Sequence, residues 1–161
     1  MKEPSSKVLR RFPYGFYSIT STDGEEVNAM VANWLTQVSY EPRLIALGLQ
    51  KTSYSHGLIE KGGVFNVNLF LKEDAELIKP FTKSRSKNPE KMHDAEFALS
   101  PETKCPILDG AAAYIECQVI DIHPAGDHDV VIGKVIGGEE IKPGNSSDTL
   151  TLEYLGWSYS G

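Results

Sequence analysis

The sequence predicts a mainly β protein, an antiparallel barrel with short helical insertions. Most of the chain consists of short segments rich in β-branched, aromatic or alternating apolar residues, which is typical of strands. Tight turns at residues 22–25 (TDGE) and 125–128 (AGDH) connect such segments, and connections this short join antiparallel neighbours. Helical patterns are few and short. An all-β barrel with small helical insertions is therefore the predicted architecture.

The expected strands follow one another along the whole chain. They cover residues 15–21, 27–35, 44–49, 64–69, 113–122, 130–136 and 149–159. Residues 84–94 and 100–109 are the long irregular pieces between them, and long loops in a compact domain are often functional.

Two helices are expected between the strands. The first covers residues 55–61, because the capping hydroxyls of Thr52 and Ser53 precede it and the pair Gly62-Gly63 follows it. The second covers residues 72–82 and starts with acidic residues, which favour the positive end of a helix. Pro80 is expected to end or kink this second helix.

Length and composition fit one domain that spans residues 1–161. Domains most often have about 100–150 residues, and the 40% hydrophobic and 24% charged residues are ordinary for a globular protein. The formal net charge of -6 disfavours nucleic acid as a partner, because phosphate binding needs clustered Lys and Arg. We interpret the one mixed basic stretch, residues 79–91, as a solvated loop face.

Cysteine content and the chain start indicate the compartment. Cys105 and Cys117 are not in a C-x-x-C spacing, and we interpret both as free thiols. The four histidines are too scattered to predict a metal site. No apolar run has the length of a signal peptide core or approaches the roughly 20 residues of a membrane span, so we expect a cytoplasmic protein with no membrane partner.

Motifs of several enzyme classes are absent from the sequence. It contains no G-x-G-x-x-G after a strand, no G-x-x-x-x-G-K-[ST], no H-E-x-x-H and no G-x-S-x-G. A nucleotide ligand would therefore not be held by a Rossmann crevice or a P-loop, and hydrolase and metalloenzyme functions are disfavoured.

Two polar clusters lie at the ends of neighbouring expected strands, where their donors could converge on one anionic, planar ligand. The clusters are Thr36-Gln37-Val38-Ser39 and Lys51-Thr52-Ser53. A helix start carries unpaired N–H groups and a partial positive charge, so these hydroxyls, with Ser55 and the Lys51 ammonium, predict a phosphate seat. The alternative is a helix cap with no ligand.

Small and polar residues interrupt the expected core strand at residues 30–36 (MVANWLT). A flat heterocycle with carbonyl and N–H groups on one rim needs a lining of this kind, apolar over its face and polar along its edge. The alternative is an ordinary half-buried strand with Trp34 in the core or at an interface.

At these residues the chain resembles the flavin-reductase-like family of FMN-binding split-barrel proteins. The family pattern N-G-M/A-T-A-S-x-x-T-S-V-S-x-D-P-P-L is matched by residues 28–44, and the S-x-T/S-H turn by Ser53-Tyr54-Ser55-His56. Residues 65–69 (FNVNL) are similar to a family strand, residues 126–135 to its G-D-H hairpin, and residues 152–159 to its closing strand. The matching pieces come in the family order along most of the chain.

The resemblance implies a split β-barrel of Greek-key type that binds FMN, with FAD as the alternative. It implies that the flavin ring and ribityl chain contact Met30, Val31, Ala32, Asn33, Trp34, Thr36, Gln37, Val38 and Ser39. It implies that the phosphate is held around Lys51, Thr52, Ser53, Ser55 and His56. His128 would stand beside the flavin and orient or polarise a nicotinamide; the alternative is a turn residue that caps a strand.

Some residues depart from the family pattern. Asn33 and Trp34 replace smaller residues, and Arg43 stands where a second proline is usual, so ring contacts and turn geometry are expected to differ. Residues 84–93 occupy the place of a family loop that can approach the flavin, often from the partner subunit. Contact with the flavin by Arg85 or Lys91 is left open.

The implied function is that of an NAD(P)H:flavin oxidoreductase. NADH or NADPH would reduce the bound flavin, which would then deliver electrons to a protein acceptor, free flavin or oxygen. A non-enzymatic FMN-binding electron-transfer protein of the flavoredoxin type is the alternative, and a flavin-free binding domain is a third. A homodimer is expected, because small split barrels expose sheet edges that a partner can bury.

Overall fold

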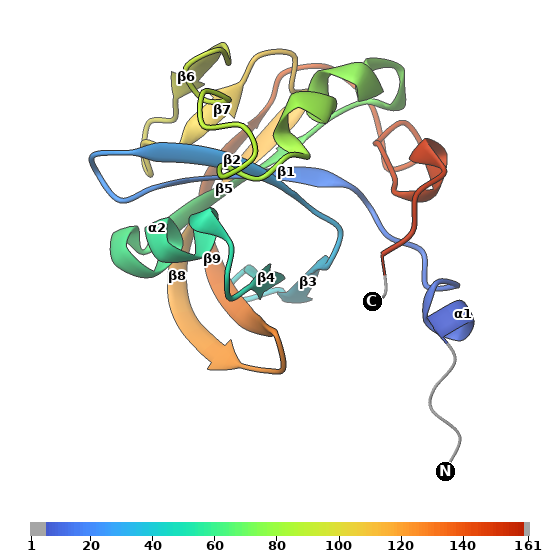
Figure 1. Cartoon of the computed structure of the whole chain (residues 1–161), viewed down its shortest axis with the longest axis horizontal. Coiled ribbons are helices and arrows are strands. Elements are labelled where there is room, and N and C mark those ends of the chain that lie inside the picture. The colour runs from blue at the N-terminus through green and yellow to red at the C-terminus, as the bar shows by residue number, and fades with distance from the viewer. Residues whose placement is uncertain (1–5, 160–161) are drawn as a thin grey trace.

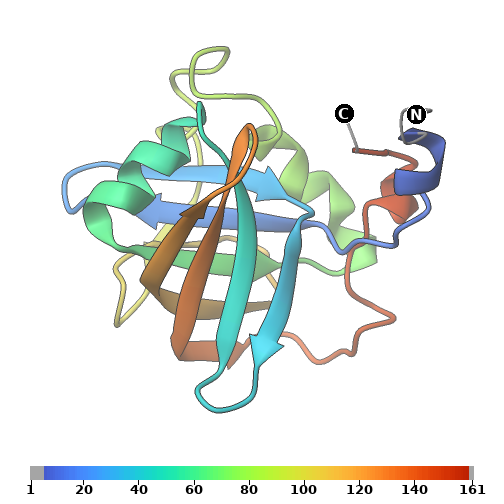
Figure 2. The ribbon, with the colours of Figure 1, turned by 90° about the horizontal axis from the view of Figure 1, so that it is seen from below.

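One strongly curved antiparallel sheet dominates the computed structural model, which describes residues 6–159. Its neighbouring strands run in the order β2-β1-β5-β8-β9-β4-β3 (Figures 1 and 2). The strands are β1 (Tyr17–Thr22), β2 (Val27–Ala32), β3 (Leu35–Ser39), β4 (Leu44–Gln50), β5 (Val64–Leu69), β8 (Ala113–Pro124) and β9 (His128–Glu140). The predicted mainly β, antiparallel split barrel is confirmed.

The two edge strands of this sheet, β2 and β3, are consecutive in the chain. Only Asn33 and Trp34 separate them, a link that can span at most about 10 Å, so the two edges stay close and the sheet curls into a barrel. The backbone N–H of Gly48 donates to the Trp34 carbonyl at 2.8 Å, which ties the link to β4. The prediction of one continuous strand over residues 27–35 was wrong, because the chain crosses from one edge to the other at this link.

The first expected helix is confirmed as α2 (Tyr54–Gly62). The Ser53 hydroxyl accepts a hydrogen bond from the His56 N–H at 3.2 Å and caps its start, while Gly63 ends it at φ 70°. The second expected helix is a 3-10 helix, η1 (Lys72–Phe81), and it departs from helical geometry at Asp74 rather than at Pro80. A short helix, α1 (Ser6–Leu9), precedes the first strand.

A two-stranded sheet, β6 (Phe97–Leu99) with β7 (Pro106–Leu108), covers the outer face of β1 and β5. The side chain of Asn68 on β5 accepts from the Leu108 N–H at 2.9 Å, and Thr20 on β1 donates to the Pro106 carbonyl at 2.6 Å. Residues 100–109, expected to be irregular, therefore contain a strand. It has three residues, too few for a periodic pattern.

The expected closing strand over residues 149–159 is wrong. Thr149 and Thr151 make only isolated bridges, to Leu71 and Gly15. A single 3-10 turn, η2 (Glu153–Leu155), follows, and Gly156 at φ 71° redirects the chain. The alternating pattern arises because Leu150 and Leu152 are buried in the core, while the backbone hydrogen bonds of this segment, to Tyr14, Phe16 and Phe70, do not extend into a regular ladder.

The hydrophobic core has two parts, one inside the barrel and one between the sheet and η1. The first includes Ile19, Leu47, Phe65, Val67 and Val131, and the second includes Phe16, Phe70, Ile78, Phe81 and Leu150. Both cysteines are free, as predicted. They are also fully buried, and burial raises the pKa of Cys105 to about 11 and that of Cys117 to about 12. Neither thiol is therefore activated as a nucleophile.

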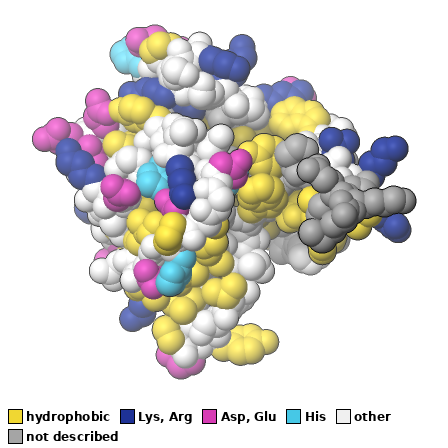
Figure 3. Space-filling model, turned by 60° about the horizontal axis from the view of Figure 1, so that its bottom comes forward, with side chains coloured by type: hydrophobic (Ala, Val, Ile, Leu, Met, Phe, Trp, Pro, Cys, Tyr) yellow, Lys and Arg dark blue, Asp and Glu magenta, His cyan; other side chains and the backbone are white. Residues whose placement is uncertain are grey.

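Several apolar side chains remain exposed on the outer surface. They include Val38 and Tyr40 near β3 and Ile120 and Val130 on the β8–β9 hairpin. Figure 3 shows groups of apolar side chains on one face, separated by charged ones. Within residues 6–159, no helix is both long enough and apolar enough to cross a bilayer.

Candidate functional site

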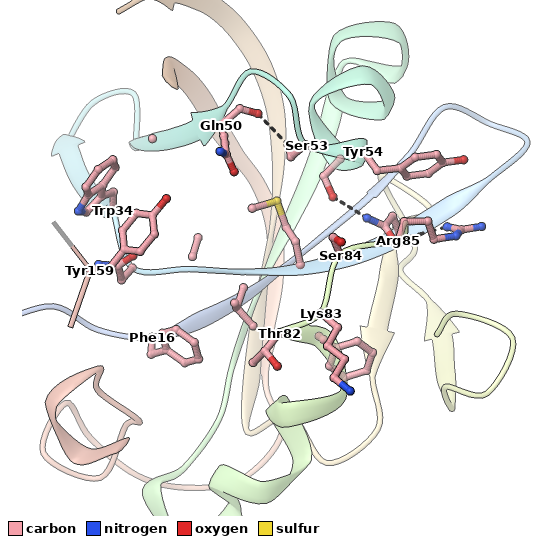
Figure 4. A pocket seen from close by; sticks show the side chains of 18 of the residues that line it. Phe16, Trp34, Gln50, Ser53, Tyr54, Thr82, Lys83, Ser84, Arg85 and Tyr159 are labelled. Carbon is pink, nitrogen blue, oxygen red and sulfur yellow. Dashed lines mark hydrogen bonds between the residues drawn. The ribbon is translucent and has the colours of Figure 1, made fainter. Parts of the chain in front are cut away.

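A cavity of about 960 Å³ lies beside the β2–β3 link. Its walls come from β2, the end of β4, the first turn of α2, the loop after η1 and the C-terminal segment (Figure 4). Drug-sized ligands and cofactors usually occupy about 300–1,000 Å³, so the cavity has room for a nucleotide-sized molecule.

One end of this cavity is aromatic. The rings of Trp34 and His128 lie 4.7 Å apart between centroids, and Tyr159 approaches Trp34 edge-on at 5.0 Å. Phe16 and Trp157 pack edge to face at 5.7 Å in the same region. Figure 4 shows Phe16, Trp34 and Tyr159 together on one side of the cavity. Aromatic faces of this kind favour a flat, polarisable ring.

The opposite end is cationic. Arg85, Lys83 and Lys91 line it, all from the loop after η1, and Figure 4 shows Lys83 and Arg85 on the side away from Trp34. Lys91 is only 3% exposed and donates to the Lys83 carbonyl at 2.9 Å. Burial, with a smaller contribution from the Arg85 charge, lowers the pKa of Lys91 to about 8. A buried cation beside a second one is a strong attractor for an anion.

The wall between the two ends carries hydrogen-bonding groups. The first turn of α2 places the Ser53 and Ser55 hydroxyls at the cavity, and Ser55 accepts from the Asn28 side chain at 2.9 Å. Asn33, on the β2–β3 link, is 7% exposed, and its side-chain N–H₂ group has no hydrogen-bond partner within the described residues. A buried unpaired donor costs about 1–3 kcal/mol, which an acceptor on a bound ligand would recover.

The structure brings many of the sequence-predicted residues to this cavity. Those that line it are Met30, Val31, Ala32, Asn33, Trp34, Thr52, Ser53, Ser55 and His128. Those that lie outside its walls are Thr36, Gln37, Val38, Ser39, Lys51 and His56. The residues that line the cavity come from the end of β2, the β2–β3 link, the start of α2 and the start of β9.

The residues outside the cavity are placed there by two local features. Because the chain crosses to the opposite edge at Asn33, residues 36–39 run along β4 as part of β3, and Thr36, Gln37 and Val38 are exposed. Lys51 and His56 instead turn to the β8–β9 hairpin. The Asp129 carboxylate lies 2.6 Å from His56 Nε2 and 3.8 Å from Lys51 Nζ, so it holds both side chains away from the cavity.

His128 is held at the aromatic end by its neighbour. Its Nδ1 lies 2.8 Å from the Asp127 carboxylate, and this hydrogen bond lowers the pKa of Asp127. Since Nδ1 is occupied, Nε2 is the ring nitrogen available to a ligand.

Several cavity residues were missed by the sequence prediction. Phe16, Gln50, Tyr54, Lys83, Trp157 and Tyr159 come from segments with ordinary strand, turn or tail patterns, and only tertiary packing places them at the cavity. The basic stretch 79–91 did carry a signal, but a wholly solvated loop was the wrong interpretation, because Lys91 is buried and Arg85 is half-buried. The clustering of Lys and Arg at residues 79–91 of an acidic protein was the sequence signal that could have predicted the cationic end of the cavity.

Comparison with protein families gives one match over nearly the whole chain. Residues 9–159 match the family described as "Flavin reductase like domain". A flavin reductase from Pseudomonas putida is 32% identical over 155 residues, which cover 96% of this chain and 86% of that protein.

Solved structures give the same picture. An NADH:FAD oxidoreductase from Streptomyces globisporus C-1027 superposes with a TM-score of 0.75 at 27% identity, over 83% of this chain and 79% of that one. An FMN-binding protein from Thermus thermophilus superposes with a TM-score of 0.78 at 25% identity, over 88% and 78% of the two chains. These proteins therefore share the fold of this chain over most of its length.

Proposed function

Because the chain belongs to the flavin reductase like family, we propose that it is an NAD(P)H:flavin oxidoreductase that binds FMN, or FAD, in the cavity beside the β2–β3 link. The observation that carries the proposal is the division of this cavity into an aromatic end and a cationic end. A flavin nucleotide has the same division, a flat ring at one end and a phosphate at the other.

The cavity residues fit such a ligand at three places. Trp34 and Tyr159 offer aromatic faces to the ring. The unpaired side-chain N–H₂ of Asn33 offers a donor to the polar rim of the ring. Toward the other end, the Ser55 hydroxyl, Lys91 and Arg85 offer donors and positive charge to the phosphate.

When bound, the flavin would accept a hydride from the nicotinamide and pass the electrons on, while the protein supplies binding and orientation. The C-terminal segment lines the aromatic end, where Trp157 packs against Phe16 and Tyr159 against Trp34. His128 stands beside Trp34 with Nε2 available, so it is the residue proposed to orient the nicotinamide.

We further propose that the protein is a homodimer in the cytoplasm. The edge strand β3 and the exposed apolar side chains Val38, Tyr40, Ile120 and Val130 support the dimer, because such surfaces are usually buried by a partner. Light scattering coupled to size-exclusion chromatography tests it. A mass of one chain would contradict the dimer and leave the flavin site intact.

Anaerobic stopped-flow mixing of the FMN-loaded protein with NADH or NADPH tests the reductase. We expect at least one nicotinamide to bleach the flavin absorbance within the turnover time of an ordinary enzyme, about 1 s or less. Slow bleaching by both nicotinamides, with fast reduction by a protein donor, would identify an electron carrier instead. Protein that takes up no flavin would refute both.

A further inference from the structure

Arg85 is held in place from the far side of the cavity. Its Nη1 donates to the Val27 carbonyl at 3.0 Å and lies 3.4 Å from the Asn28 side-chain oxygen. Its guanidinium carbon lies over the Tyr54 ring, 4.7 Å from the centroid. Figure 4 shows this stack at the end of the cavity away from Trp34. The loop after η1 is thereby joined to β2 and to α2.

Tyr54 is itself fixed by Glu26. The Tyr54 hydroxyl donates to the Glu26 carboxylate, and this hydrogen bond is the main reason that the pKa of Tyr54 is raised. Two hydrogen bonds hold the Glu26 backbone: its N–H donates to Asp23 Oδ1 at 2.8 Å, and its carbonyl accepts from the Thr22 hydroxyl at 2.8 Å. The turn between β1 and β2 therefore sets the orientation of the Tyr54 ring, on which Arg85 rests.

The positive charge of Arg85 has no carboxylate partner. Within residues 6–159, none of the ion pairs includes Arg85 or Lys91. Arg85 and Lys91 both line the cavity, and the Arg85 charge contributes to the lowered pKa of Lys91, so the two cations lie near each other there. An anion in this region would meet two charges that the protein itself leaves uncompensated.

We propose that Tyr54 and Glu26 are positioning residues that hold Arg85 at the phosphate end of the cavity and so set the preference for phosphorylated flavins over riboflavin. This inference rests on the proposed flavin binding. A free arginine side chain loses rotamer entropy when it is fixed by a ligand, and the contact with the Tyr54 ring orders Arg85 before the ligand arrives. Riboflavin has no phosphate and gains nothing from this ordering.

Fluorescence titration with FMN and with riboflavin tests the proposal, with the ratio of the two dissociation constants as the readout. R85A should raise the dissociation constant of FMN about tenfold, the equivalent of one charge-assisted hydrogen bond, and change that of riboflavin less than about twofold. Y54A should raise the dissociation constant of FMN about three- to tenfold and leave that of riboflavin nearly unchanged. Y54F should have a smaller effect, because the aromatic ring remains. Tyr154→Ala is the matched control, since Tyr154 is 55% exposed, also lies against a cation, Lys72, and lies outside the cavity.

The double variant Y54A/R85A decides whether Tyr54 acts through Arg85. The proposal predicts the same FMN to riboflavin ratio as R85A alone. A ratio in the double variant that equals the product of the two single-variant effects would overturn the proposal, as would an equal loss of FMN and riboflavin affinity in Y54A.

If Y54A does not fold, E26A replaces it and should weaken FMN binding, but not riboflavin binding, by about two- to threefold. An unchanged ratio of the two dissociation constants in E26A would overturn the proposal. Wild-type protein that binds neither flavin would refute the proposed function as well, whereas wild-type binding with an unchanged ratio in Y54A refutes this inference alone.

Discussion

The imidazole of His128 packs against the indole of Trp34, with ring centroids 4.7 Å apart and planes inclined by 56°. The two residues are far apart in the chain: Trp34 lies on the link between the two edge strands, and His128 begins β9. They meet because Gln50, at the end of β4, pairs with His128, while Gly48 on the same strand contacts the Trp34 link. The aromatic end of the cavity is thus a consequence of how the barrel closes.

Replacement of His128 by alanine should slow reduction more than it weakens flavin binding. The ring lies at the aromatic end, away from the cations, so H128A should reduce the rate of flavin bleaching by NAD(P)H about 10- to 100-fold and change FMN affinity less than about threefold. Stopped-flow rates and FMN titration measure both. H123A is the control, because His123 is an exposed histidine on the same hairpin. Equal losses of rate and FMN affinity in H128A would assign His128 to flavin binding.

Replacement of Asn33 by leucine, which has the same number and branching of side-chain heavy atoms, should have opposite effects on stability and on binding. The unpaired N–H₂ group is a cost in the ligand-free protein, so N33L should leave the free energy of unfolding unchanged or raise it by about 1 kcal/mol. The same variant should weaken FMN about tenfold, because a donor to the ring is lost. Urea unfolding of the apoprotein and FMN titration test this. A clear loss of apoprotein stability would show that Asn33 serves the fold.

Lys91 should make the apoprotein more stable at alkaline pH. Since its pKa is about 8 in the folded protein and about 10.5 when exposed, the folded state binds fewer protons than the unfolded state between these values. The free energy of unfolding should therefore gain about 1–3 kcal/mol from Lys91 as pH rises from 8 to 10.5. Urea unfolding across this range should show that K91M lacks the gain, whereas K83M, in the exposed part of the loop, keeps it. Parallel pH profiles for wild type and K91M would contradict the assigned environment.

Gly62 should be intolerant of any side chain. A Cβ at this last residue of α2 would lie 1.9 Å from the Thr22 carbonyl oxygen, which is backbone and cannot yield cheaply. G62A should lower the free energy of unfolding by about 1–3 kcal/mol, measured by urea unfolding. Gly57, in the same helix, has open space around its Cβ position, so G57A should raise stability by about 0.5–1 kcal/mol. A stable G62A would mean that α2 does not pack against the end of β1 as described.

The sequence predicted the parts of the fold that local chemistry controls. The cap at Ser53, the glycine stop after α2 and the turns of the β1–β2 and β8–β9 hairpins depend on residues next to one another. Prediction from the sequence failed where contacts with distant segments of the chain determine the local structure. Nothing in the pattern of residues 27–35 shows that the chain changes edges at Asn33, and nothing in residues 149–159 shows that this segment makes only isolated bridges, to Leu71 and Gly15.

The same distinction applies to the site. The hydroxyls at the start of α2 and the residues of the β2–β3 link could be predicted from their own segments. The direction taken by Lys51 and His56 could not, because it depends on Asp129, more than seventy positions later. The roles of Arg85 and Tyr159 depend on tertiary packing across the cavity in the same way.

A crystal structure of the protein with FMN tests the central claim most directly. The two-ended cavity predicts the flavin ring beside Trp34 and Tyr159, with the phosphate within hydrogen-bond distance of Lys91 or Arg85 and close to Ser53. FMN bound outside this cavity, or bound with its phosphate at the aromatic end, would contradict the account.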